Sequence, residues 1–333
     1  MTPQYDNPRA FSIGETPLLN VPGYFDARLY LKLESENPFG SIKDRTAFFI
    51  LRDLQRTGQL NDGAQIVEST SGNLGIALCH LLRDSDVGFT CLIDETISEE
   101  KRAALCALGA NTTLVALDDA VDYREARMRR AAAIQSETGA VWTNQYDNDA
   151  NVLAHRNTTA EEIWRQSEGQ VGVIVAPVGT GGTVCGLTAG LKAYRPDIIS
   201  IGVEPLGSTV FGGEHGDYLS IGWGLAGQSG IIRRWGGGID YFAKVDDAET
   251  VKTAHWAAEN LEPSIGLTGC GVISAAIEAI ARFPDRKVVA LIPDNAEKYQ
   301  TVLSGTVFDR DIVRTEFHEA SEWKRQHGIA PAP

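Results

Sequence analysis

Short apolar segments alternate with amphipathic segments along most of the chain, and this alternation limits the folds open to it. Residues 29–35 alternate in polarity as a strand does, and residues 45–58 repeat apolar positions with helical periodicity. The same pair recurs at 64–69 and 74–84, and similar pairs follow as far as the apolar segment 287–294. Repeated strand–helix pairs predict mostly parallel sheets with helices on both faces.

The chain has 333 residues, which is longer than the chain that a single hydrophobic core usually supports. We therefore expect an α/β fold of two three-layer α/β/α domains with a cleft between them. Hydrophobic residues make up 43% of the sequence and charged residues 22%, as in ordinary globular proteins. This composition excludes a largely disordered chain.

The charge balance argues against two classes of partner. The formal net charge is -14, from 44 acidic and 30 basic residues, and it opposes attraction to nucleic acid and to anionic membranes. No apolar segment is long enough for a membrane helix, and residues 1–19 lack the basic start and apolar core of a secretory signal. We expect a cytoplasmic protein without nucleic-acid or membrane partners. An anionic substrate would need a local basic pocket.

Cysteine and histidine spacing gives no support for a metal site. The five cysteines are scattered and form no CxxC pair, and the six histidines form no HExxH or HxH motif. We expect no bound metal and no disulfide framework.

Three turns rich in Gly, Ser or Asn follow predicted strands: 37–45 (NPFGSIKDR), 69–73 (STSGN) and 179–183 (GTGGT). Because ligands collect at the carboxyl ends of parallel strands, all three turns could line one crevice. GTGGT suits a phosphate, since its glycines expose backbone N–H groups at the start of a predicted helix. It is neither a P-loop nor a dinucleotide fingerprint, and by itself it could be a plain tight turn.

Lys43 is the candidate nucleophile. It lies between Ser41 and Asp44 at a predicted helix start, where the positive end of the helix dipole favours a neutral amine. Such a lysine can form a Schiff base with a carbonyl compound. Considered alone, a surface lysine paired with Asp44 is the simpler interpretation.

In their order and combination, the three turns resemble the signature segments of the fold-type II pyridoxal-phosphate enzymes, which share the tryptophan synthase β-like fold. The resemblance is to the cysteine synthase and cystathionine β-synthase family. It extends to AHRNTTAEEIW (154–164), GVEP (202–205) and PDNAEKY (293–299), and so covers about residues 11–305. It implies bound pyridoxal 5′-phosphate, small amino-acid substrates and a homodimer.

The resemblance also implies a division of the chain and a role for individual residues. A large cofactor-binding domain would comprise 1–38 and 147–333, and a smaller mobile substrate domain 39–146. Lys43 would hold the cofactor and act as the base at Cα, and Asn73 would hydrogen-bond the cofactor's 3′ oxygen. The substrate carboxylate would be held by Thr70, Ser71, Gly72 and Gln145. The cofactor phosphate would be bound by Gly179, Thr180, Gly181, Gly182 and Thr183. Without the resemblance, Gln145 would be read as a loop-capping amide.

The sequence departs from the family before its last long helix. Where the family offers a serine to the pyridine nitrogen, an ungapped match places Gly269. Thr268, Cys270 or water would then face the nitrogen, or the turn would cap the helix without touching the cofactor. A nitrogen without a carboxylate partner makes a weaker electron sink, which favours β-elimination and replacement over transamination.

Within the family, three segments resemble the N-(2-amino-2-carboxyethyl)-L-glutamate synthases, which supply 2,3-diaminopropionate to siderophore and antibiotic pathways. They are ESTSGNLG (68–75), WTNQYDN (142–148) and the segment 208–212. The predicted reaction is β-replacement on an activated L-serine, with O-phospho-L-serine favoured, by the amine of L-glutamate. Arg233 and Arg234 could meet the carboxylates of glutamate or could simply be solvated.

Two alternatives stay open at this point. A cysteine synthase would use sulfide with O-acetyl- or O-phosphoserine, through the same mechanism. A non-catalytic regulatory relative would bind cofactor or partner without turnover, but such a protein has no need of Lys43 as a base.

Overall fold

The computed structural model describes residues 3–22, 25–70, 72–97, 99–118, 120, 122–219, 222–299 and 315–332. The chain divides into two compact units. Unit 1 comprises Met1–Ile13 and Lys43–Asn151, and unit 2 comprises Gly14–Ile42 and Val152–Pro333. The chain therefore passes from one unit to the other after Ile13, Ile42 and Asn151.

The N-terminal segment belongs to unit 1, whereas the predicted division grouped residues 1–38 with the larger domain. Tyr5 is fully buried, and its hydroxyl donates to Leu81 O at 2.8 Å. Its ring stacks on Phe11 at 5.6 Å and meets Phe48 edge-on at 5.8 Å between centroids. These contacts bury apolar surface that the sequence pattern did not assign to any element. The predicted roles of the two domains stay predictions.

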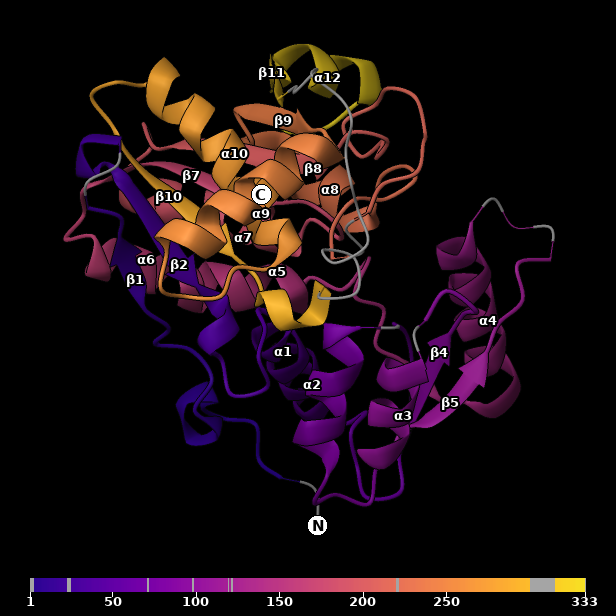
Figure 1. Cartoon of the computed structure of the whole chain (residues 1–333). Coiled ribbons are helices and arrows are strands. Elements are labelled where there is room, and N and C mark those ends of the chain that lie inside the picture. Colours follow the sequence, from indigo (N-terminus) through magenta and orange to yellow (C-terminus); the bar gives the residue numbers. More distant parts are fainter. Residues whose placement is uncertain are drawn as a thin grey trace. The chain divides into compact units, whose positions relative to one another are not determined.

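Unit 1 contains a four-stranded parallel sheet in the order β5-β4-β3-β6. Its strands β4 and β5 are labelled in Figure 1. Its strands are β3 (Gln65–Ser69), β4 (Gly88–Ile93), β5 (Asn111–Leu114) and β6 (Val141–Trp142). Its helices are α1 (Lys43–Arg56), α2 (Asn73–Leu82), α3 (Glu99–Ala107) and α4 (Tyr123–Thr138). Val67 and Leu92 pack with Ala131 of α4, whereas Cys91, on the next position of β4, faces α2. Helices therefore cover both faces, as the alternation predicted.

Unit 2 contains a seven-stranded sheet in the order β1-β2-β10-β7-β8-β9-β11. Its strands are β1 (Leu18–Asn20), β2 (Leu29–Leu33), β7 (Val171–Pro177), β8 (Ile199–Pro205), β9 (Tyr241–Val245), β10 (Lys287–Ile292) and β11 (Thr315–Glu319). The five inner strands are parallel, and β1 and β11 run antiparallel at the two edges.

Two cores lie on the two faces of this sheet. On β10, Val288, Ala290 and Ile292 face one core, whereas Val289 and Leu291 face the other. The first core is closed by α9 (Asp247–Asn260) and α10 (Leu267–Arg282). The second is closed by α6 (Ala160–Gln166), α7 (Gly182–Tyr194), α8 (Gly230–Trp235) and α12 (Ala320–His327). The three-layer α/β/α prediction is confirmed for this unit.

Two regions differ from the expected elements. The helical pattern of residues 154–166 does not form one continuous α-helix, because α5 (Ala150–Ala154) leads into the π-helical turn His155–Thr159 before α6 begins. The edge strand β11 was not predicted, since the sequence TEFHE alternates polar residues with one phenylalanine and carries little apolar signal. Edge strands need only one apolar face.

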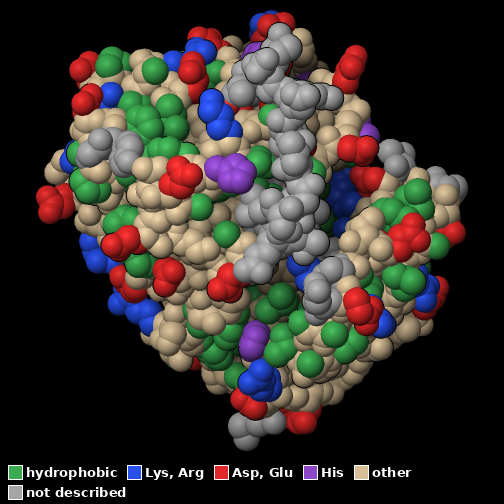
Figure 2. Space-filling model, viewed as in Figure 1, with side chains coloured by type: hydrophobic (Ala, Val, Ile, Leu, Met, Phe, Trp, Pro, Cys, Tyr) green, Lys and Arg blue, Asp and Glu red, His purple; other side chains and the backbone are tan. Residues whose placement is uncertain are grey.

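The visible surface intersperses acidic and basic side chains (Figure 2). Among the described helices, none is long and apolar enough to cross a bilayer. In the same part of the chain, no group of His, Cys, Asp and Glu is arranged to hold a metal ion. All five cysteines are free thiols.

Candidate active site

The predicted substrate residues of unit 1 lie at the carboxyl edge of its sheet. Thr70 follows β3 and is buried, Gly72 caps α2, and Asn73 is the first residue of that helix. Gln145 follows β6 and is also buried. Ser71 lies outside the described residues. One edge of one sheet thus brings four predicted site residues together, as expected where parallel strands end.

Gln145 is held by hydrogen bonds of both its side chain and its backbone. Its Nε2 donates to Ser69 O at 3.1 Å, and its carbonyl accepts from Asn151 Nδ2 at 2.9 Å. These bonds are those of a loop-capping amide, the alternative that the sequence left open. Its contact with a substrate carboxylate stays a prediction.

Glu68 is a site residue that sequence reasoning missed. It is fully buried and accepts hydrogen bonds from Thr143 Oγ1, from Ser69 N at 2.8 Å and from Gln145 N at 3.1 Å. Burial raises the pKa of this carboxyl to about 7, against the opposing effect of the three hydrogen bonds and of Lys43. The sequence feature that could have identified Glu68 is its place at the start of ESTSGN, one residue before the turn.

Lys43 is half-buried and is the first residue of α1. Burial lowers the pKa of its amine to about 8, and the nearby Glu68 charge acts in the opposite direction. A lysine with this pKa supplies a substantial fraction of neutral amine near neutral pH, which an ordinary lysine does not. The amine is therefore suited both to imine formation and to proton transfer.

Replacing Glu68 with glutamine is expected to lower the pKa of Lys43 below about 8, because the carboxylate that favours the ammonium form is removed. The neutral fraction at pH 7 should rise roughly a few-fold. The pH dependence of amine modification in the cofactor-free protein measures this pKa. Glu99→Gln, an exposed carboxylate of α3 in the same unit, is the control. An unchanged or raised pKa of Lys43 in folded Glu68→Gln protein would contradict the conclusion that the Glu68 carboxylate raises the pKa of this amine.

In unit 2, the predicted phosphate segment 179–183 joins β7 to the start of α7. Gly181 has a φ of 88°, a left-handed conformation that glycine adopts without steric cost. A Cβ on this residue would lie 2.6 Å from Ile232 Cδ1. The turn needs glycine for both reasons, and it presents the first N–H groups of a 13-residue helix.

The neighbours of this turn fix its shape. Ser229 Oγ donates to Thr180 O at 2.6 Å and accepts from Ile232 N at 3.0 Å, so the N-cap of α8 also holds the turn. His155 is fully buried, and its Nε2 lies 3.4 Å from Thr183 Oγ1. Sequence reasoning included His155 only within AHRNTT and did not assign it to this turn.

Thr268 is fully buried in the first turn of α10, near the end of β10. Gly266 N donates to Asp294 O at 3.1 Å, which ties the start of α10 to that strand end. Trp223 packs on Gly271 so closely that a Cβ there would lie 2.2 Å from its ring, and its Cα lies 3.7 Å from a Cβ built on Gly179. Trp223 thus contacts both the phosphate segment and α10. The partner of the pyridine nitrogen stays a prediction.

The arginines of the two units differ in exposure and in their ion pairs. Arg127 of α4 donates from Nε to Ser69 Oγ at 3.2 Å and forms an ion pair with buried Asp94. Arg233 and Arg234, which the sequence offered as partners for glutamate carboxylates, are exposed on α8. Contact between either and a substrate stays a prediction.

Considered separately, the residues of each unit suit one part of pyridoxal phosphate. The glycine turn at the start of α7 presents backbone N–H groups and the positive helix end that a phosphate needs. Lys43 supplies an amine whose pKa is lowered to about 8, which increases the fraction of the neutral form that can bond to an aldehyde. The polar loop that leads into Asn73 follows the strand carrying Glu68 in the same unit as Lys43.

The chain matches the family model described as "Pyridoxal-phosphate dependent enzyme" over residues 10–294. This range contains every predicted site residue. The chain is also 34% identical over 304 residues to cystathionine beta-synthase of Apis mellifera, a match that covers 87% of this chain and 60% of that longer protein.

Two relatives of similar length are equally informative. One is cysteine synthase of Haemophilus influenzae, 32% identical over 320 residues, with 90% of this chain and 96% of the relative covered. The other is N-(2-amino-2-carboxyethyl)-L-glutamate synthase of Ralstonia nicotianae, 34% identical over 297 residues, with 86% of each covered. Among solved structures, O-ureido-L-serine synthase aligns with a TM-score of 0.82 and 27% identity, covering 93% of this chain and 98% of that one.

Proposed function

The chain belongs to the pyridoxal-phosphate-dependent enzymes of the cysteine synthase and cystathionine β-synthase type, and from this premise we propose that its nucleophile is L-glutamate. Members of this group catalyse β-replacement with the cofactor. The proposed reaction joins O-phospho-L-serine to the amine of glutamate and yields N-(2-amino-2-carboxyethyl)-L-glutamate and phosphate.

The observation that carries this proposal is the Ralstonia relative of that name, which is 34% identical with 86% of both chains covered. The segments 68–75, 142–148 and 208–212 support it, because they resemble the glutamate-using enzymes at the substrate loop and the adjoining turns. Leu74 stands where cysteine synthases usually have threonine, so one hydroxyl near the substrate is absent.

When bound, the cofactor supplies the electron sink that allows a proton to leave Cα and a substituent to leave Cβ. In the proposed mechanism, the turn 179–183 binds its phosphate, and Asn73 orients its ring. Thr70, Ser71, Gly72 and Gln145 bind the substrate carboxylate. Lys43 removes the proton from Cα, and its lowered pKa allows it to accept that proton as the neutral amine.

The remaining bond changes balance without any redox partner. The bond from Cβ to the phosphate oxygen breaks with its electron pair, and phosphate leaves. The glutamate nitrogen then forms a bond to Cβ and loses one proton. Lys43 returns a proton to Cα. Its position in the same unit as the substrate loop is consistent with both transfers.

We expect glutamate to be preferred over sulfide by at least about tenfold in kcat/KM, which is the ratio that defines specificity. Holoenzyme is incubated with O-phosphoserine or O-acetylserine and with each nucleophile in turn, and products are identified by mass spectrometry. Efficient cysteine formation without a glutamate adduct would reject this proposal. It would then favour the second candidate.

That second candidate is a cysteine synthase, for which the Haemophilus relative is the specific support. A non-catalytic regulatory role predicts no turnover of any activated serine, so the same assay separates all three. A homodimer and a place in diaminopropionate supply for siderophores or antibiotics stay predictions of the resemblance. A cytoplasmic location stays a prediction of the sequence, which lacks an apolar span and a secretory signal.

A further inference from the structure

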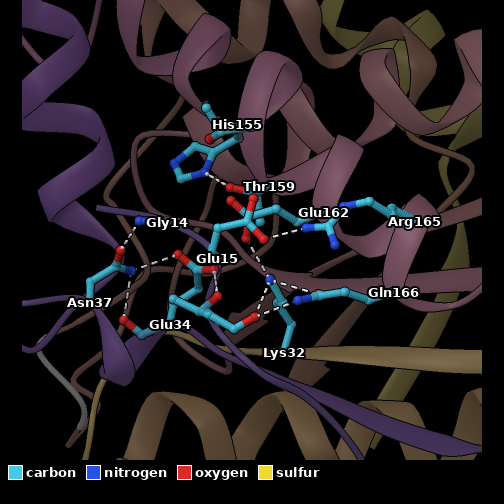
Figure 3. Close-up of polar contacts among 12 residues, drawn as sticks. Gly14, Glu15, Lys32, Glu34, Asn37, His155, Thr159, Glu162, Arg165 and Gln166 are labelled. Carbon is cyan, nitrogen blue, oxygen red and sulfur yellow. Dashed lines mark hydrogen bonds and ion pairs between the residues drawn. The ribbon is translucent and has the colours of Figure 1, made fainter. Parts of the chain in front are cut away.

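The chain reaches Lys43 through a short segment, 37–42, that is fixed at its first residue. Asn37 follows the 3-10 turn Glu34–Glu36 at the end of β2 and is buried. Figure 3 shows its side chain between Gly14 and Glu34. Both partners belong to unit 2, as Asn37 does.

The amide of Asn37 uses both kinds of hydrogen-bonding atom. Its Nδ2 donates to a Glu34 carboxylate oxygen and to Glu34 O, each at 2.9 Å. Its Oδ1 accepts from Gly14 N at 3.0 Å. Gly14 begins unit 2 after the first passage of the chain between the units, and Lys43 follows the second passage. One side chain therefore links the two chain segments that border these passages.

A buried charge network holds this amide in turn (Figure 3). Glu34 is fully buried and accepts from Thr16 Oγ1 at 2.7 Å. Thr16 O accepts from Lys32 Nζ at 2.7 Å, and Lys32 forms an ion pair with Glu162 at 2.7 Å. Buried ionic groups with satisfied hydrogen bonds resist displacement, because any shift leaves a charge unpaired.

The other end of the segment is fixed by backbone bonds. Gly40 N donates to Asn37 O at 2.9 Å and closes a turn, and Ile42 N donates to Pro293 O at 2.9 Å. Ser41 forms an isolated bridge with Asp294 after the end of β10. The backbone path into Lys43 is therefore determined at Asn37 and again at Ser41 and Ile42.

We propose that Asn37 is a positioning residue for Lys43. Through Glu34 and Gly14 it holds the turn from which the lysine backbone departs, and so it sets where the amine meets the cofactor aldehyde. The proposal rests on the proposed role of Lys43. In the step concerned, the neutral amine adds to the aldehyde carbon, and the aldehyde oxygen leaves as water with both amine protons as the carbon–nitrogen double bond forms.

Loss of the Asn37 amide should slow this bond formation and leave non-covalent binding intact. Cofactor-free Asn37→Ala protein is mixed with pyridoxal 5′-phosphate, and the visible absorption of the lysine-bound cofactor is followed over time. A slower rate by roughly 10- to 100-fold is expected, as for small misplacements of a reacting group. The affinity for pyridoxine 5′-phosphate, an alcohol that cannot form the bond, should stay within about twofold of wild type.

Gln166→Ala is the matched control. Gln166 is bound to Lys32 Nζ at 2.9 Å and to Thr16 O at 2.9 Å in the same network, but it does not contact Asn37. Its attachment rate should match wild type even where its melting temperature falls. An equal slowing in Gln166→Ala, or a wild-type rate in folded Asn37→Ala, overturns the proposal.

Two further measurements keep the outcome decisive. If Asn37→Ala does not fold, Thr16→Val removes the hydroxyl that holds Glu34, and it should slow attachment roughly a few-fold by the same reasoning. No slowing there overturns the proposal. Borohydride reduction of wild-type holoenzyme followed by peptide mapping tests the premise separately, because label on another lysine rejects the role of Lys43 itself.

Discussion

Replacing Lys43 with alanine is expected to abolish the visible absorption of the bound cofactor and to reduce turnover of any activated serine by at least about 10³-fold. The amine is both the covalent attachment point and the base at Cα in the proposed mechanism, so both readouts should fall together. Absorbance spectra and single-turnover rates on purified protein measure them.

The matched control is Lys252→Ala, which removes an exposed lysine of α9. Its spectrum and rate should equal those of wild type. In wild type, covalent attachment should slow about tenfold for each pH unit below about 8, because the neutral amine is the reacting form. Absorption and turnover retained in Lys43→Ala would reject the assignment of this lysine.

The layered fold could be predicted because strand and helix periods differ. The apolar segment 287–294, which was predicted as a strand, contains β10, where Val288 and Val289 face different helical layers. The π-helical turn His155–Thr159 could not be predicted, since it keeps an amphipathic pattern close to that of an α-helix. The attachment of Tyr5 to unit 1 depends on contacts between residues far apart in the sequence.

The turns of the candidate site could be predicted from the sequence, but only some of its side chains could. Gly181 was predictable because a glycine-rich turn between a strand and a helix is typical of phosphate binding. Glu68 was not, since its raised pKa comes from burial among Thr143, Gln145 and Ser69, which no local pattern encodes. Asn37 is the first residue of the segment NPFGSIKDR, but its partners Glu34 and Gly14 become visible only in the folded chain.

Gly181→Ala is expected to weaken cofactor binding roughly 10- to 100-fold, and the reason is local. The φ of 88° costs a non-glycine residue about 1–2 kcal/mol, and the new Cβ would lie 2.6 Å from Ile232 Cδ1 and Cγ1. The side chain of Ile232 can shift to relieve the contact, but the backbone strain is relieved by a change in φ, which moves the N–H groups at the start of α7. Those N–H groups are the proposed phosphate donors.

Comparing two ligands separates phosphate binding from general damage. Affinity for pyridoxal 5′-phosphate should fall in Gly181→Ala, while affinity for pyridoxal, which lacks the phosphate, should stay within about twofold of wild type. Gly328→Ala is the matched control, because its φ of 63° imposes similar backbone strain with no atom within 4 Å of the new Cβ. It should lose stability but bind both ligands normally. Equal losses for both ligands in Gly181→Ala would mean that the turn shapes the pocket without binding the phosphate, and Thr180 and Thr183 would lose their proposed role with it.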